Sequence, residues 1–115
     1  MDDLVAAIAT DCGLDTDTAR TVAVVILKFL ESAGPADQTR ALIDALPGAR
    51  EAMAANAAGS SPGLLGAFSD LSAAGLGTEQ IQTAARSFGT FARGQAGDEA
   101  VDAVVSSIPG LGPFV

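Results

Sequence analysis

Carboxylate side chains are the groups in this sequence that could bind a metal ion or transfer protons, and they gather in two places. The first is the stretch DCGLDTD, which holds Asp11, Asp15 and Asp17. The second is the start of a predicted helix near the end of the sequence, which holds Asp98, Glu99 and Asp102. The first stretch lacks the D-x-D-x-D-G loop and the distant Glu of a calcium-binding EF-hand. Acidic side chains are also favoured at the start of a helix, where they accept N–H hydrogen bonds and meet the positive end of the dipole. We interpret Asp15 and Asp17 in this way; for the second group, a divalent-cation site stays open beside the same interpretation.

Nucleophiles and general bases are scarce. The chain has no His and no Tyr, so it lacks the commonest general base, and a Ser or Cys triad with histidine is excluded. Cys12 is the only cysteine, which excludes a disulfide within the chain and indicates a reducing compartment. No cation stands near Cys12 in the sequence to lower its pKa, so we expect an inert, packed thiol. We predict no catalytic residue, no cofactor, no metal-binding residue and no enzymatic activity.

The charge balance narrows the range of partners. The 115 residues carry a net charge of −8, with only 6 Lys and Arg. Nucleic acids and anionic membranes are bound through clustered cations, so neither is an expected partner. The most apolar run, VAVVIL (22–27), is far shorter than the roughly 20 residues that a bilayer requires. The start of the chain also lacks the features of a signal peptide. We expect a soluble, cytoplasmic protein of one domain, without membrane insertion.

Apolar side chains recur at helical spacing in two segments. They follow i, i+3, i+4, i+7 order, as on one face of an α-helix, at Ala19, Val22, Ala23, Ile26, Phe29 and Leu30, and again at Ile81, Ala84, Ala85, Phe88, Phe91 and Ala92. Each segment follows a helix-start signal and precedes a break, at 32–37 and at 94–99. A second, shorter apolar helix is predicted after each break.

These two segments belong to a longer internal repeat. A shift of 62 positions places residues 13–48 (the first unit) on 75–110 (the second unit) without a gap, with nine of 36 pairs identical. Both units end in Pro-Gly, which stops a helix and turns the chain. We interpret this shared ending as the stop signal of a duplicated helical hairpin; two unrelated helix-breaking turns are the alternative. The repeat predicts that Phe29 and Phe91 are buried in equivalent places.

The remaining segments complete a helical fold. Residues 2–11, 49–56 and 63–74 are predicted helices, and 57–63 is a linker. We expect an all-α protein, a compact bundle of six to seven short helices built from two related units. The succession of GL, a helix, a break and ALPG, followed by a Gly/Ser/Pro-rich linker and a second GL-helix unit, resembles the small bacterial VcgC/VcgE-type domain of unknown function. The resemblance covers residues 4–110 and implies an all-helical fold, but that family has no assigned activity to transfer.

Two apolar features are candidate interaction surfaces. Val24, Val25 and Leu27 make the first long helix apolar on nearly all sides, where the second unit has Arg86, Ser87 and Gly89. Such a helix is buried either within the chain or at a subunit interface. The C-terminal segment IPGLGPFV carries Leu111, Phe114 and Val115, which either pack on the core or are free to bind a partner. The sequence favours a non-catalytic scaffold or protein-interaction module, self-association included. The alternative is a carrier of a small, lipid-like ligand in an Ala-lined core.

Overall fold

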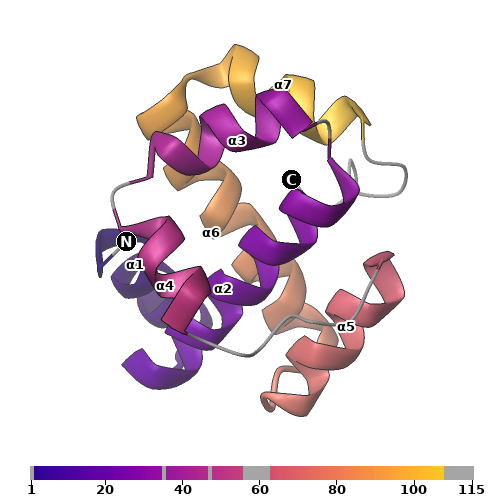
Figure 1. The fold of residues 1–115 in the computed structure, drawn as a ribbon. Coiled ribbons are helices and arrows are strands. Elements are labelled where there is room, and N and C mark those ends of the chain that lie inside the picture. Colours follow the sequence, from indigo (N-terminus) through magenta and orange to yellow (C-terminus); the bar gives the residue numbers. More distant parts are fainter. Residues whose placement is uncertain (1, 35, 47, 56–62, 108–115) are drawn as a thin grey trace.

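Helices are the regular secondary structure of the described part of the chain. The structure is a computed structural model, and it describes residues 2–34, 36–46, 48–55 and 63–107. Within these ranges there are seven helices and no strand (Figure 1): α1 (Asp2–Cys12), α2 (Thr16–Ala33), α3 (Ala36–Asp44), α4 (Ala49–Ala55), α5 (Gly63–Ala73), α6 (Thr78–Ala96) and α7 (Asp98–Ser107). The predicted all-α fold is confirmed, and the run VAVVIL lies inside α2.

Glycine residues explain where helices α1 and α5 end. Gly13 and Gly75 follow α1 and α5 with φ of 67° and 99°, a backbone region that glycine adopts without steric cost. The residue after each glycine donates its N–H back into the preceding helix, from Leu14 to Ala9 O at 2.9 Å and from Leu76 to Leu71 O at 3.2 Å. Bonds of this span close the ends of many helices. The same chain reversal therefore precedes both long helices, at positions 62 residues apart.

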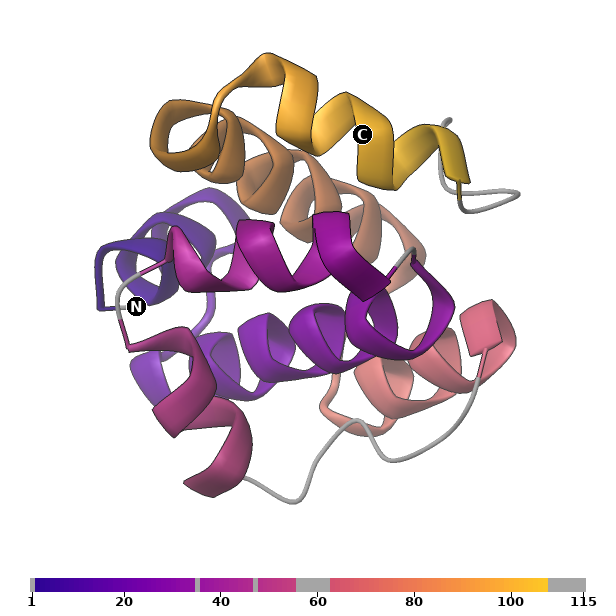
Figure 2. The same ribbon diagram turned by 45° about the horizontal axis from the view of Figure 1, so that its top comes forward.

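Long helices α2 and α6 form the centre of the bundle. The short helix α1 packs against both of them, whereas α5 packs against α2. Helices α3 and α7 lie side by side across one face, and α4 packs against α2 and α3 (Figure 2). The core is built largely of alanine and branched aliphatic side chains, among them the fully buried Ala19, Ala23 and Ala84. Small side chains at these sites let the helices approach one another closely.

The helix boundaries agree with the shift of 62 residues. Shifted by 62, α2 would span 78–95 and α3 would span 98–106, and α6 and α7 are found at Thr78–Ala96 and Asp98–Ser107. Helix α1 would likewise fall on 64–74, where α5 spans Gly63–Ala73. The duplication itself stays a prediction.

The expected equivalence of the two phenylalanines is wrong. Phe29 is only 6% exposed and faces α5 in an apolar cavity, whereas Phe91 is half-buried and lines a different hollow, beside Asp2 and Asp3. The reason lies in the packing of the leading helices. Helix α5 covers Phe29 on α2, whereas the α1 residues Asp2, Asp3 and Ala7 line open hollows beside Phe91 and leave that ring half-buried.

The apolar face of α2 is buried within the chain. Val24, Val25 and Leu27 are 0%, 1% and 0% exposed. Of the two interpretations of this face, packing inside the chain is the one that the structure shows. These three side chains leave no area for a second molecule, so the candidate interaction surface assigned to them is corrected to core.

Candidate functional site

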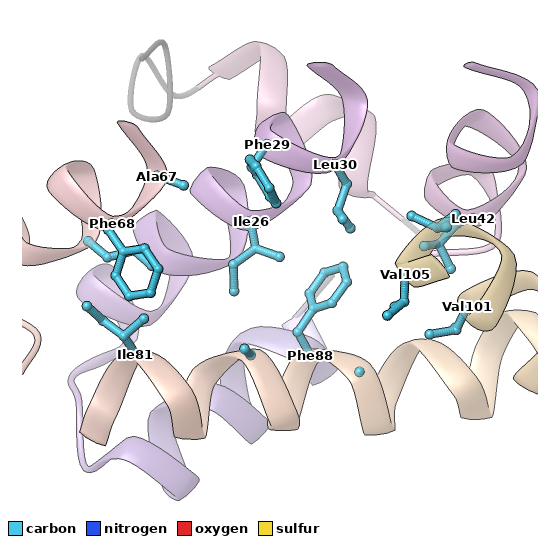
Figure 3. Close-up of a pocket in the computed structure, with 14 residues that line it drawn as sticks. Ile26, Phe29, Leu30, Leu42, Ala67, Phe68, Ile81, Phe88, Val101 and Val105 are labelled. Carbon is cyan, nitrogen blue, oxygen red and sulfur yellow. The ribbon is translucent and has the colours of Figure 1, made fainter. Parts of the chain in front are cut away.

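An apolar cavity is the most distinctive concave feature of the described residues. It has a volume of about 60 Å³, is partly open to the surface, and lies among α2, α3, α5, α6 and α7. Figure 3 shows Ile26 and Phe29 from α2, Phe68 from α5 and Phe88 from α6 pointing toward one another around it. We call this space the apolar cavity.

The sequence explains the α6 wall of the apolar cavity. Its lining residues there are Ile81, Ala85, Phe88 and Gly89, which are spaced as one face of a helix. Two of the four are small. In the predicted repeat Gly89 aligns with Leu27, whose side chain is 0% exposed. Gly89 contributes no side chain to the cavity wall, and the repeat would explain the space by the absence of a counterpart of Leu27.

The chemistry of the apolar cavity is limited to packing. Every described residue that lines it is apolar, so it offers no group to transfer a proton, hold a metal or orient a polar substrate. Its volume is also below the roughly 300–1,000 Å³ of sites that enclose a drug-sized ligand.

The first acidic group includes a residue that caps a helix, as predicted. Asp15 is the N-cap of α2, and its carboxylate accepts a hydrogen bond from the Thr18 N–H at 2.7 Å. That hydrogen bond lowers the pKa of Asp15.

Two of the three carboxylates in the second acidic group pair with one neighbouring cation. The Arg93 guanidinium lies 2.8 Å from Asp102 and 3.7 Å from Asp98. Hydrogen bonding to Asp102 and the charges of both acids raise the pKa of Arg93. Within the described residues, no three His, Cys, Asp or Glu side chains are grouped to hold a metal ion. The open alternative of a divalent-cation site at Asp98, Glu99 and Asp102 is therefore not supported.

Cys12 is held at the end of α1 as a structural thiol. Its Sγ donates to the backbone carbonyl of Gln80 at 3.5 Å, and the Gln80 side-chain amide donates to the Cys12 carbonyl at 3.1 Å. Burial raises the pKa of the Cys12 thiol, and the neighbouring Asp11 raises it further. A raised pKa leaves less of the reactive thiolate, so this pair of hydrogen bonds serves to join α1 to α6.

Sequence reasoning did not identify the apolar cavity as a site. The candidates Leu111, Phe114 and Val115 lie outside the described residues, and Val24, Val25 and Leu27 lie in the core. The residues of the apolar cavity were missed as a site because helices from both units supply them. One signal was available: the exchange of Leu27 for Gly89 marks a place where the second unit has less side-chain volume than the first.

Comparisons with models of protein families, with curated proteins and with solved structures found no match to this chain. The resemblance to the VcgC/VcgE-type family stays a prediction. In the part of the chain that the structure describes, no helix combines the length and the hydrophobicity needed to cross a bilayer.

Proposed function

We propose that this protein is a non-catalytic, cytoplasmic protein-interaction module that acts as a small helical scaffold. The apolar cavity supports this proposal, because it combines a purely apolar wall with an opening at the surface. A protein segment can bury an apolar side chain in such a space, and packing of this kind needs no catalytic group. The single cysteine supports the cytoplasmic location. Self-association is one form of the same function, with a second copy as the partner.

A carrier of a small apolar ligand is the second candidate. The wholly apolar lining favours it, because an alkyl chain would lose no hydrogen bonds on entering. The volume of about 60 Å³ counts against it, since a lipid-like ligand needs several times this space. The carrier function would therefore require α5 to move away from α6 and α7.

Native mass spectrometry of the protein isolated from its host tests both candidates. The interaction module predicts a complex with a second polypeptide, whereas the carrier predicts a bound molecule of a few hundred daltons. A complex with a protein supports the proposal only if it depends on the apolar cavity. Ala85 is half-buried in the cavity wall, and Ala85→Asp places a carboxylate there. This substitution is therefore expected to weaken the affinity of the complex by at least about 100-fold.

Ala103→Asp is the matched control. Ala103 is also half-buried in a helix, on α7, but it does not line the apolar cavity. The control should keep the complex, because the added charge lies away from the proposed contact. A complex lost equally in both variants, or retained in both, would contradict the assignment of the interaction to the apolar cavity. A chain that emerges alone and without ligand would contradict both functions.

A further inference from the structure

An open hollow lies between α1 and α6 and shares no described lining residue with the apolar cavity. It has a volume of about 260 Å³. Two residues of α1 and five of α6 line it: Ala7 and Asp11, and Thr83, Arg86, Ser87, Thr90 and Phe91. The hydrogen bonds between Cys12 and Gln80 hold the two helices together next to Asp11. We call this space the polar hollow, because five of its seven described lining residues carry polar or charged groups.

The hydroxyl of Ser87 has no hydrogen-bond partner among the described residues. Ser87 is only 6% exposed, and buried hydroxyls are nearly always paired because an unpaired one costs free energy. One turn earlier, Thr83 donates its hydroxyl to the Glu79 carbonyl at 2.9 Å, whereas Ser87 makes no such bond within its helix. A serine hydroxyl reorients by rotation about one bond, so a polar group that enters the polar hollow can pair with it. The polar hollow thus offers a hydrogen-bonding group that the fold itself does not use.

Two opposite charges line the polar hollow from different helices. Asp11 on α1 and Arg86 on α6 are both exposed. Neither forms an ion pair within the described residues, although Arg20, Arg50 and Arg93 each pair with an aspartate. A molecule that carries both an ammonium and a carboxylate group can pair with Asp11 and Arg86 at once, because each of them binds the opposite charge.

From these observations we propose that the polar hollow binds a zwitterionic α-amino acid with an apolar side chain. Arg86 binds its carboxylate, Asp11 binds its ammonium group, and the Ser87 hydroxyl donates to the carboxylate. Phe91 is half-buried and, with Ala7, supplies the apolar surface on which the side chain packs. The volume of about 260 Å³ suits a molecule of this size, because it lies just below that of sites for drug-sized ligands.

An NMR titration of the full-length, isotope-labelled chain at pH 7 tests the proposal. The probe is L-phenylalanine, and two matched molecules each lack one of its charges: 3-phenylpropionate has no ammonium group and 2-phenylethylamine has no carboxylate. We expect L-phenylalanine to reach half-saturation at about 1 mM, and each matched molecule to bind at least about fivefold more weakly through the loss of one exposed ion pair. The backbone amides of Ala7 and Thr83 should shift, and those of Leu71 and Val104 in the apolar cavity should not.

Three results of this titration would overturn the proposal. One is the absence of any saturable shift up to about 20 mM L-phenylalanine. Another is equal affinity for either molecule that carries a single charge, because this would mean that the pair of opposite charges is not recognised. The third is a set of shifts centred on Leu71 and Val104, which would place the probe in the apolar cavity.

Ser87→Ala separates binding from folding. We expect this variant to bind L-phenylalanine about fivefold more weakly and to melt at the same temperature as the wild type or higher, because the hydroxyl has no partner in the fold. A lower Tm with unchanged affinity would show that the hydroxyl serves the fold, and it would contradict the site.

Arg86→Gln should also weaken binding by about fivefold. Its matched control is Arg40→Gln, an exposed arginine on α3 outside the polar hollow, which should leave the affinity unchanged. Equal losses in both variants would reveal a general effect of net charge and refute the role of Arg86. The site does not depend on the proposed function: Ala85→Asp lies in the apolar cavity and should leave amino-acid binding unchanged, so the two tests succeed or fail separately.

Discussion

Leu27 and Gly89 are aligned by the predicted repeat, and replacing each by alanine should have opposite effects. Leu27 is 0% exposed in the centre of α2, so Leu27→Ala removes buried methyl groups and leaves a space behind. Core substitutions of this kind cost about 2–5 kcal/mol. At about 0.05–0.15 kcal/mol per residue, a chain of 115 residues has a total stability of about 6–17 kcal/mol. The loss is therefore a large share of the total.

The expected shift in melting temperature follows from the size of the chain. An unfolding entropy of about 2.1 cal/mol/K per residue gives about 240 cal/mol/K for the whole molecule. Each kcal/mol lost should then lower Tm by about 4 °C, so Leu27→Ala should lower it by about 8–20 °C.

Gly89→Ala is the matched substitution in the second unit. Gly89 is buried within α6 and lines the apolar cavity, so its replacement removes a poor helix former and adds a methyl group beside empty space. Alanine is favoured over glycine inside a helix by about 1 kcal/mol. We therefore expect Tm to rise by about 4 °C, although alanine at position 27 should lower it.

Far-ultraviolet circular dichroism is the suitable measurement, because the chain has no Trp or Tyr to report on folding by fluorescence. A cost below about 1 kcal/mol for Leu27→Ala would mean that this side chain is not in the core. A Gly89→Ala variant that melts lower than the wild type would show that the methyl group meets packed atoms. Either result would refute the explanation of the apolar cavity by the exchange of leucine for glycine.

The helices could be predicted from the sequence because neighbouring residues determine them. Gly13 and Gly75 adopt positive φ and Asp15 caps α2, and each of these effects acts within about five residues. The apolar spacing of α2 and α6 likewise depends on one helical period. For this reason the predicted helices 2–11, 49–56 and 63–74 fall close to α1, α4 and α5.

The apolar cavity could not be predicted in the same way, because its walls come from helices that are distant in the sequence. Phe29 faces it because α5 packs on α2, and nothing near Phe29 specifies that choice. Phe91 has the same local pattern and a different environment. The link between Cys12 and Gln80 is another contact of this kind, since it spans 68 positions of the chain. Periodicity indicates which face of a helix is apolar, but it does not indicate which neighbour covers that face.

Four further substitutions test the core and one helix cap. Val24→Arg should leave most molecules unfolded by circular dichroism, because Val24 is 0% exposed and a buried, unpaired cation is very costly; a folded variant of unchanged sedimentation would contradict its place in the core. Phe29→Ala should cost about 3–5 kcal/mol in urea unfolding, whereas Phe91→Ala should cost clearly less because that ring is half-buried, so equal costs would contradict the different environments of the two rings. Asp15→Ala should lower Tm at pH 7, since the ionised carboxylate accepts the Thr18 N–H and its pKa is lowered in the folded state. A carboxyl group with a lowered pKa stabilises the fold above the ordinary titration range of aspartate, and this contribution is lost as the pH falls through the lowered pKa. The difference in Tm between wild type and variant should accordingly shrink as the pH falls from 7 toward 2, and a difference that stays constant would show that the charge of Asp15 plays no part in capping α2.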